Sequence, residues 1–281
     1  ATGAVSGSDS VGGLVGWNTA AIAASFWNTT TSGTGTGVGL GDLGGATGTT
    51  TAQMQDPLLY ATAGWSTSVW AYGSGVEGYG IGLAYLKDVT AVADRPTHTT
   101  LFAGGFGTDA NPYTITNWTQ LQNINYNTNV LTNGYFFALS NNLHSATTGY
   151  TTLASASANS GEGWNPIGND TDGFNGSFDG QGYTIDALTI NRPITDYVGL
   201  FGRTNTGATI KNIGLTNVDI RGQNYVGGLV GYSYGATVAN SYVSGNISGI
   251  SFVGGLTGRS YQGSITNAYA TSSVAGTGDK I

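Results

Sequence analysis

The chain contains no cysteine, one methionine, five prolines and few charged residues, which make up 8% of its 281 residues. Without cysteine it forms neither disulfides nor a thiolate zinc site. Its eight lysines and arginines are scattered in a chain of formal net charge −7, which argues against a nucleic-acid partner. No apolar run approaches the roughly 18 residues of a membrane span, and no segment of signal-peptide type opens the sequence. We therefore expect no nucleic acid, no membrane insertion and no cofactor.

Glycine is the residue that the chain has in abundance, with 48 copies, and aromatic residues make up a further 11%. Disordered chains normally combine a high net charge with few aromatic residues, and this chain has neither property. Many glycines between short apolar segments are typical of strands joined by tight turns. The composition therefore predicts an ordered, all-β protein.

The most informative pattern is a short phrase, Val-Gly-Gly-Leu-Val-Gly or a close variant, that begins at Val11, Val198, Val226 and Val253. The last three copies start 28 and 27 residues apart, at positions 198, 226 and 253. A second phrase follows at a nearly fixed distance and reads Asn-Ser-Tyr at 240–242. A fixed period of this length is typical of a solenoid.

Equal spacing within each repeat places equivalent side chains above one another, about 4.8 Å apart, in successive turns of the chain. Apolar residues at these places would face the interior. The repeats therefore predict two buried ladders, Val198 with Val226 and Val253, and Leu200 with Leu229 and Leu256.

Asn240 and Asn267 occupy the same place in successive repeats. They are either polar contacts on the outer face or residues that adopt a strained turn and bond to one another. The second interpretation is favoured, because asparagine tolerates the left-handed conformation and forms local hydrogen bonds.

The period lapses between the two groups of repeats, and the sequence indicates four segments. They are 1–28, the end of one repeat array; 29–94, a Gly/Thr-rich loop and an aromatic closure, with a linker near 89–98; 99–185, a segment with a short helix that leads into the solenoid; and 186–281, the remaining repeats. Within them we expect a loop over 29–51, a short helix over 51–55, and a helix capped by Asn117 that presents Trp118, Leu121 and Ile124 on one face.

Both ends of the chain carry the same half-repeat phrase, at 1–7 and 270–276. Apolar residues lie near each end, Val5 and Val11 at one and Val274 and Ile281 at the other. Because an uncovered sheet edge readily pairs with another strand, we expect neighbouring copies or repeats to stack end to end.

Several phrases together resemble the GLUG-repeat regions of large bacterial surface proteins, including filamentous-haemagglutinin-like adhesins exported by two-partner secretion. They are the Val-Gly-Gly-Leu-Val-Gly copies and the residues 264–271, 178–185, 164–168, 50–55 and 63–65. The resemblance implies a right-handed parallel β-helix with short helical and loop insertions, located at the cell surface or secreted. It implies no catalysis, because such repeats are stalk or adhesive material in that family.

Motifs of catalysis and metal binding are weak in this sequence. The G-x-S-x-G match at 231–235 lacks a following helix and a downstream histidine, since His98 and His144 both precede it. Asp170, Asp172 and Asp179 offer oxygen ligands suited to Ca²⁺, but the full calcium loop is absent, so a polar turn is favoured.

The enzymatic alternative is a β-helical polysaccharide-degrading enzyme, which needs acid and base groups clustered on one face. Glu77 and Glu162 are the only glutamates, and the aspartates are dispersed. This pattern favours a protein without enzymatic activity.

The candidate binding residues are aromatic. Tyr225, Tyr232, Tyr234 and Tyr261 either stack on sugar rings or protect a flat sheet by packing on it. Five N-x-S/T sequons are candidate glycosylation sites, at Asn28, Asn117, Asn169, Asn175 and Asn246.

The sequence thus predicts a structural and adhesive segment of a cell-surface or secreted solenoid protein. Its expected partners are neighbouring copies or repeats and host or matrix glycans. A subunit of a self-assembling extracellular filament is an alternative function, as is the polysaccharide-degrading enzyme.

Overall fold

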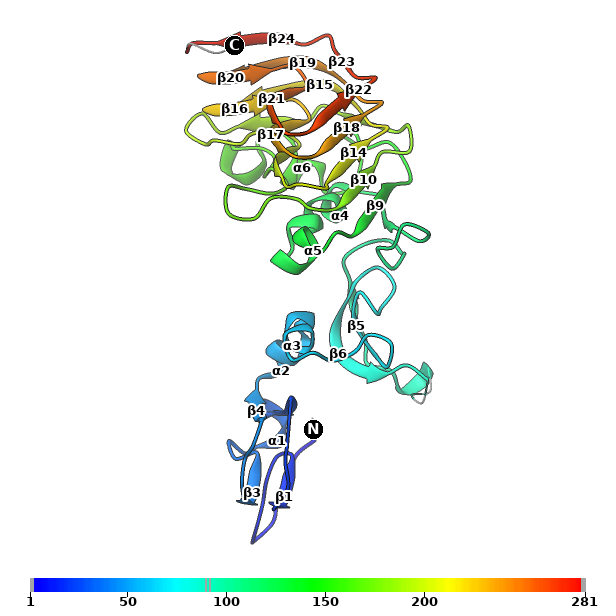
Figure 1. The fold of residues 1–281 in the computed structure, drawn as a ribbon, viewed down its shortest axis with the longest axis vertical. Coiled ribbons are helices and arrows are strands. Elements are labelled where there is room, and N and C mark those ends of the chain that lie inside the picture. The colour runs from blue at the N-terminus through cyan, green and yellow to red at the C-terminus, as the bar shows by residue number, and fades with distance from the viewer. Residues whose placement is uncertain (1–2, 89, 91, 279–281) are drawn as a thin grey trace. The chain divides into compact units, whose positions relative to one another are not determined.

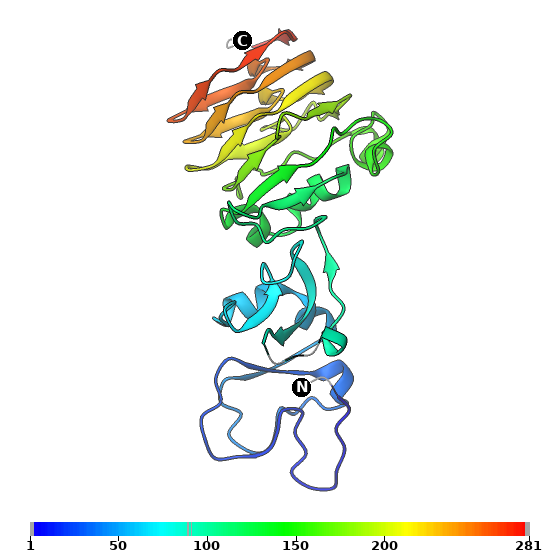
Figure 2. The same cartoon turned by 90° about the vertical axis from the view of Figure 1, so that its right-hand side faces the viewer.

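The structure, a computed structural model, describes residues 3–88, 90 and 92–278. The chain forms two compact units, Ala1–Thr100 and Leu101–Ile281 (Figures 1 and 2). The predictions made for Ile281 lie outside the described residues.

Unit 1 contains two small parallel sheets, short helices and one antiparallel sheet. Its elements are β1 (Val15–Asn18), β2 (Ser25–Asn28), α1 (Thr29–Ser32), β3 (Val38–Gly41), β4 (Ala46–Thr49), α2 (Thr51–Gln55), α3 (Pro57–Thr62), β5 (Trp70–Gly73), β6 (Gly80–Leu86), the 3-10 helix η1 (Val92–Asp94) and β7 (Thr99–Thr100).

The expectation of a loop over 29–51 is wrong, because this segment contributes β3 and β4, which pair in parallel with β1 and β2. The physical reason is the buried indole of Trp27. A Cβ added to Gly13 or Gly37 would lie 2.4 Å from the ring of Trp27, so only glycine leaves room for it there. The glycines that suggest a loop in the sequence instead make room for a buried side chain.

The expected helix over 51–55 is confirmed as α2, with a capping box between Thr50 and Gln53. A second helix, α3, follows directly and begins with Pro57. Aromatic residues of the segment expected to form a closure contact one another: the ring centroids of Trp65 and Trp70 lie 4.3 Å apart, and Trp70 pairs with Leu86 across β5 and β6.

Unit 2 begins with short helices and continues as a regular stack of strands. Its elements are β8 (Tyr113–Ile115), α4 (Trp118–Gln122), η2 (Asn123–Asn125), α5 (Thr128–Thr132), β9 (Phe136–Leu139), α6 (Tyr150–Leu153), η3 (Ala158–Gly161), β10 (Ser177–Asp179), β11 (Thr184–Asp186), β12 (Thr189–Asn191), β13 (Phe201–Thr204), β14 (Thr209–Lys211), β15 (Gly214–Arg221), β16 (Asn224–Gly227), β17 (Val230–Tyr234), β18 (Thr237–Ala239), β19 (Tyr242–Gly249), β20 (Ser251–Gly254), β21 (Thr257–Tyr261), β22 (Ser264–Thr266), β23 (Tyr269–Ala270) and β24 (Ser273–Gly276).

The helix that Asn117 was expected to cap is α4, since its side chain accepts a hydrogen bond from the Gln120 backbone. Trp118, Leu121 and Ile124 are all buried, as the sequence predicts, although Ile124 lies in the 3-10 helix η2, beyond the end of α4. The indole of Trp118 lies 5.8 Å from that of Trp164, which is also buried. This aromatic core underlies the first strands of the stack.

The strands of unit 2 pair in parallel with strands one repeat away. The sheets follow the orders β8-β9-β10-β14-β18-β22, β11-β15-β19-β23, β13-β17-β21 and β16-β20, with β12 paired to β15 and β24 to β19. Figure 1 shows the successive strands, from green to red, lying one above another. The expectation of a mostly β chain with parallel sheets and short helical insertions is confirmed.

The valine ladder is confirmed, because Val198 pairs with Val226, Val226 pairs with Val253, and all three are buried. Leu200 and Leu229 are buried as predicted, and Leu256 of the last repeat is half-buried. Further aligned sets fill the same interior: Phe178, Ile210 and Val238; Ile185, Leu215 and Val243; and Ile190, Ile220 and Ile247.

The interpretation of Asn240 and Asn267 as mutually bonded turn residues is also confirmed. Both have positive φ, as does Asn212 one repeat earlier. Asn240 donates to Asn212 at 3.0 Å and Asn267 donates to Asn240 at 3.2 Å. The series ends at Asp179, which accepts a hydrogen bond from Asn212. These four residues form the Asn ladder.

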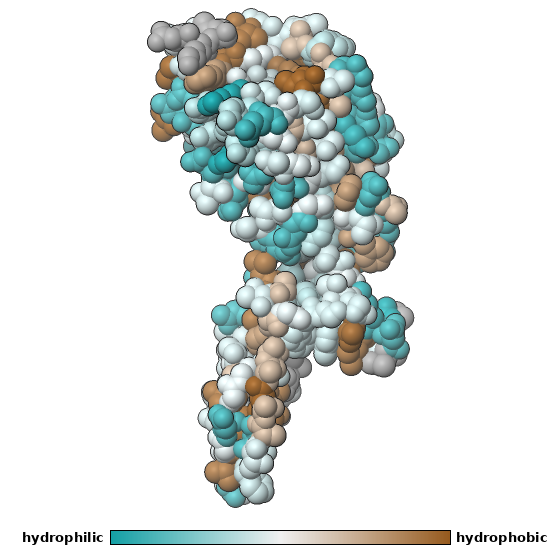
Figure 3. All heavy atoms as spheres, in the orientation of Figure 1, coloured by the Kyte–Doolittle hydropathy of each residue, from teal (hydrophilic) through white to brown (hydrophobic). Residues whose placement is uncertain are grey.

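The last described strands of unit 2 expose apolar side chains. Ile265 is 45% exposed, Tyr269 58% and Val274 38%, whereas the residues aligned with them one repeat earlier are more buried. Brown, hydrophobic surface accordingly lies at the end of the unit formed by these strands, among teal and white atoms (Figure 3).

Candidate functional site

The four tyrosines singled out in the sequence lie on adjoining strands of unit 2. Tyr225 lies in β16, Tyr232 and Tyr234 lie in β17, and Tyr261 ends β21. The rings of Tyr225 and Tyr232 stack at 5.6 Å, and those of Tyr234 and Tyr261 at 5.7 Å. The structure therefore brings all four together in one cluster.

Two more aromatic residues extend this cluster and were missed in the sequence. Tyr197 stacks on Tyr225 with ring centroids 5.1 Å apart and planes 7° from parallel. Phe252 also stacks on Tyr225, with ring centroids 4.8 Å apart. Tyr197 and Phe252 stand directly before the repeated valines 198 and 253, as Tyr225 stands before Val226, so aligning the repeats could have found them.

Arginines cover the same rings. The guanidinium of Arg259 lies 5.2 Å from the ring centroid of Tyr232 and 5.6 Å from that of Tyr261. The guanidinium of Arg203 lies 6.0 Å from the Tyr232 ring. We call the whole set the aromatic stripe: Tyr197, Tyr225, Tyr232, Tyr234, Phe252 and Tyr261, with Arg203 and Arg259.

Three aromatic residues of the stripe have a backbone conformation that disfavours bulky side chains. Tyr197, Tyr225 and Phe252 have φ of 60°, 55° and 54°, a left-handed conformation that bulky side chains rarely adopt. Such strain costs about 1–3 kcal/mol per residue and concentrates at functional sites. The rings are nevertheless held half-buried and parallel, at the same place in successive repeats.

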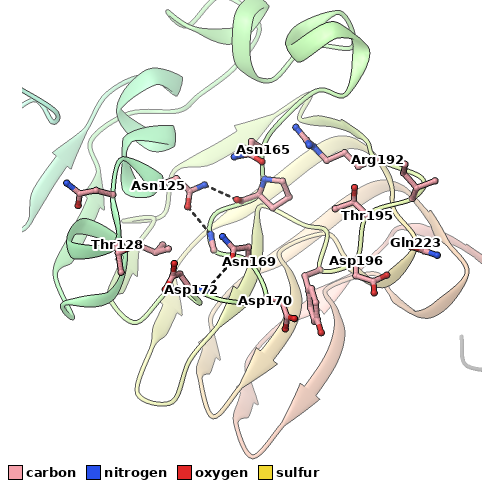
Figure 4. Close-up of a pocket in the computed structure, with 16 residues that line it drawn as sticks. Asn125, Thr128, Asn165, Asn169, Asp170, Asp172, Arg192, Thr195, Asp196 and Gln223 are labelled. Atoms are coloured by element: carbon pink, nitrogen blue, oxygen red, sulfur yellow. Dashed lines mark hydrogen bonds between the residues drawn. The ribbon is translucent and has the colours of Figure 1, made fainter.

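At one end the aromatic stripe borders a pocket of about 650 Å³. Tyr197 is part of the wall, together with residues from η2 and α5, from the 165–172 loop and from the 192–197 loop (Figure 4). Burial and the neighbouring Asp170 carboxylate raise the pKa of Tyr197. Asp170 itself pairs with Arg203 at 3.1 Å.

The candidate calcium site is not assembled. Asp170 pairs with Arg203, while Asp179 pairs with Lys211 at 3.3 Å and ends the Asn ladder. Within the described residues, no group of three or more His, Cys, Asp or Glu side chains is placed to hold a metal ion. The polar turn favoured in the sequence is present instead, since Asn169 accepts hydrogen bonds from the backbone of Thr171 and Asp172.

The candidate glycosylation sites differ in how their side chains are bonded. Asn28 is buried, caps α1 and donates to Thr51, so its amide nitrogen is occupied. Asn117 caps α4 and donates to Thr116, while Asn175 donates to the carbonyl of Thr132. Asn169 and Asn246 are exposed and donate no side-chain hydrogen bond within the described part of the chain.

The residues considered for catalysis have surroundings that do not suit the roles considered for them. Ser233 is 1% exposed and lies inside the stack, in register with Thr204 and Ser260. Glu162 is paired with Arg192 at 2.8 Å, and Glu77 is an exposed residue of unit 1. A buried serine of this kind does not fit the exposed nucleophile of a G-x-S-x-G motif.

The regular part of the stack matches a known family. A family model described as the GLUG motif fits residues 222–248 and 253–275, which hold most of the strands from β16 to β24. The chain carries GLUG motifs. The resemblance stated for the sequence is therefore confirmed, and both motifs contribute to the aromatic stripe.

Two curated proteins are similar to about half of the chain. Halomucin of Haloquadratum walsbyi is 36% identical over 147 residues, 51% of this chain and 2% of its own length. A protein of Evansella cellulosilytica, provisionally described as a Gly-rich membrane protein, is 36% identical over 138 residues, 48% of this chain and 15% of its own length. The chain thus spans only a small share of both relatives.

A solved structure from Bacteroides ovatus, provisionally described as an immunoglobulin A1 protease, is similar at a TM-score of 0.48 and 23% identity. It covers 62% of this chain, and the match covers 51% of its own chain. In the part of the chain that the structure describes, no helix is long and apolar enough to cross a membrane.

Proposed function

We propose that this chain is a non-catalytic, structural segment of a cell-surface or secreted protein, and that its aromatic stripe binds carbohydrate. The GLUG motifs support a repetitive structural role. The names of the two relatives, a halomucin and a Gly-rich membrane protein, support a location at the cell surface.

The finer fold that we propose for unit 2 is a right-handed parallel β-helix. It is supported by the parallel pairing of each strand with strands about one repeat away, as in Ile210 with Val238 and Val238 with Ile265. Such a fold suits a spacer, because each turn of the chain contacts only its neighbours and turns can be added without altering the rest.

The aromatic stripe is the observation that carries the adhesive function. Parallel, partly exposed rings present flat apolar faces, on which the C–H faces of sugar rings can stack. Arg203 and Arg259 lie beside these rings and offer planar N–H donors for sugar hydroxyls. The recurrence of aromatic residues at three equivalent positive-φ positions supports a role for the rings beyond packing.

The test is binding to immobilised neutral glycans, measured for the chain and for Tyr232→Ala. Tyr232 contacts Tyr197, Tyr225, Tyr234 and both arginines, so its loss should weaken binding about tenfold or more. The matched control is Tyr242→Ala, which breaks a stacked pair with Tyr269 on another sheet of the same repeats. Absence of binding, or an equal loss in both variants, would contradict the function.

End-to-end association is a second candidate function, favoured by the exposed Ile265, Tyr269 and Val274 on the last described strands. We propose that a further repeat, of the same chain or of a second copy, covers β21 to β24. Val274→Lys should then reduce any association seen by sedimentation velocity as the concentration is raised. A particle that stays monomeric at all concentrations would contradict association between copies.

The absence of catalysis is tested with the chain itself and polysaccharide substrates. We expect no turnover, and no change in any property for Glu77→Gln or Glu162→Gln beyond the loss of the pair with Arg192. Turnover that disappears in one of these variants would support the polysaccharide-degrading alternative instead.

A further inference from the structure

The pocket beside the aromatic stripe has the size and construction of a small-molecule site. Its volume of about 650 Å³ lies within the roughly 300–1,000 Å³ typical of such sites. Its wall comes from α5 and η2, from the loops 165–172 and 192–197, and from Gln223 of the next repeat.

Hydrogen bonds hold this wall in place. The Asn125 side chain donates to the carbonyl of Pro166 at 2.8 Å and accepts from the backbone of Gly168 at 3.0 Å (Figure 4). The Arg192 guanidinium donates to the carbonyl of Trp164 at 3.0 Å. A pocket fixed in this way needs little rearrangement on binding, which lowers the entropic cost.

Several polar side chains of the wall are available to a ligand. Asn165, Asp172 and Gln223 form no side-chain hydrogen bond within the described part of the chain. Together they offer two amide groups, which both donate and accept, and one carboxylate, which accepts. This mixture matches the hydroxyls of a sugar, each of which donates and accepts.

The charges of the wall disfavour an anionic ligand. Asp170 is paired with Arg203, and Arg192 with Glu162. Asp172 and Asp196 have no cationic partner among the described residues, and Asp196 instead accepts hydrogen bonds from Asn224. These two carboxylates leave the pocket negative, which disfavours a uronic acid or a sulfated sugar.

Tyr197 connects the pocket to the aromatic stripe, because it lines the pocket and stacks on Tyr225. We propose that the pocket holds one uncharged pyranose ring of a glycan whose following rings lie along the aromatic stripe. This inference rests on the proposed carbohydrate function. It adds that one end of the bound glycan lies in the pocket and that the site prefers neutral sugars.

The test separates the pocket from the stripe by ligand length. Methyl glycosides of mannose, glucose, galactose and N-acetylglucosamine are long enough for the pocket alone, and the corresponding hexasaccharides reach the stripe as well. The pocket variant Asn165→Ala/Gln223→Ala should lose both classes of ligand, by about tenfold or more. Tyr232→Ala should weaken the hexasaccharides and leave the methyl glycosides unchanged, since Tyr232 does not line the pocket.

Three results would overturn the inference. One is a pocket variant that binds the sugars as well as the unaltered chain does, while Tyr232→Ala binds the hexasaccharides less tightly. This result would contradict the pocket but would leave the proposed function of the aromatic stripe intact. Another is tighter binding of oligogalacturonate or hyaluronan fragments than of the neutral hexasaccharides. The third is no binding of any of these sugars, which also contradicts the proposed function. Asp172→Lys is expected to shift the preference toward the acidic fragments and to leave the unfolding temperature unchanged.

Discussion

At the scale of the residue, unit 2 repeats two left-handed backbone positions with different side chains. Asn212, Asn240 and Asn267 suit this conformation, because a short amide side chain tolerates positive φ and bonds to its neighbours. Aromatic residues at 197, 225 and 252 do not suit it, because a bulky side chain in this conformation costs about 1–3 kcal/mol. Stacking, ring burial and the Arg259 guanidinium offset this cost. The aromatic stripe therefore carries strain that the Asn ladder avoids.

Substitutions of Asn240 should separate backbone strain from hydrogen bonding. Asn240→Gly keeps the positive φ accessible and loses the bonds with Asn212 and Asn267, which should lower the free energy of unfolding by about 1–2 kcal/mol. Asn240→Ala loses the bonds and adds left-handed strain, for a further loss of about 1 kcal/mol. Urea denaturation checks the order, and an alanine variant as stable as the glycine variant would contradict it.

A charge in the valine ladder should unfold the repeats. Val226 is fully buried between Val198 and Val253, so Val226→Asp places an unpaired carboxylate in the interior and should cost more than about 3 kcal/mol. The control is Ser273→Asp, an exposed position on β24. Thermal unfolding followed by circular dichroism checks both, and a fully stable Val226→Asp variant would refute the repeat register.

At the scale of the element, the sequence predicts what repeats and misses what depends on distant contacts. The ladders of unit 2 recur with a fixed period and could be predicted to the residue. The strands β3 and β4 could not be predicted, because they depend on the packing of Trp27 against glycines at other places in the chain, such as Gly13 and Gly37. The pocket was also missed, since its wall joins non-repeating loops, and Asn169, Asp170 and Asp172 were noted there only for other chemistry, glycosylation and calcium binding.

The packing around Trp27 predicts that glycines close to one another in sequence differ in their tolerance of alanine. A Cβ at Gly37 would lie 2.4 Å from the indole, and Gly37→Ala should cost about 1–3 kcal/mol through overpacking. Gly35 has no atom within 4 Å of an added Cβ, so Gly35→Ala should be near neutral. Urea denaturation monitored by tryptophan fluorescence checks the pair, and equal effects would count against the Trp27 packing.

The antiparallel sheet of unit 1 should weaken in acid. Burial lowers the pKa of His98 below its ordinary value, and the ring bonds to the carbonyl of Leu83 at 2.8 Å. The folded state therefore favours the neutral form of His98. The stability that this preference contributes is complete above about pH 6.5, the pKa of a histidine in the unfolded chain, and is lost as the pH falls through the lowered pKa of His98 in the folded state. Hydrogen exchange of Gly80–Leu86, corrected for intrinsic rates, should show lost protection on acidification.

The control for this pH dependence is His98→Gln, which retains an N–H donor toward Leu83 but does not titrate near neutral pH. Its Gly80–Leu86 segment should keep the same corrected protection at each pH. If the variant lost protection on acidification as the unaltered chain does, another group would be responsible.

At the scale of the whole molecule, unit 2 combines a repetitive scaffold with the binding face proposed for it. The GLUG motifs supply the stacked strands, and those strands hold the rings of the aromatic stripe at regular intervals. The chain spans 2% and 15% of its two relatives, so its role in a longer protein would be that of one segment among many. Many weak glycan contacts along such a protein would add by avidity.

The most direct test of this account is NMR of the chain labelled with ¹⁵N-tyrosine, which gives at most one backbone amide signal for each of its 16 tyrosines. The titrant is a mixture of neutral hexasaccharides of mannose, glucose, galactose and N-acetylglucosamine. The account predicts that the signals of Tyr197, Tyr225 and Tyr232 move together and saturate, while those of Tyr242 and Tyr269 stay in place. Signals that all remain unmoved, or movement confined to Tyr242 and Tyr269, would contradict the carbohydrate-binding function of the aromatic stripe.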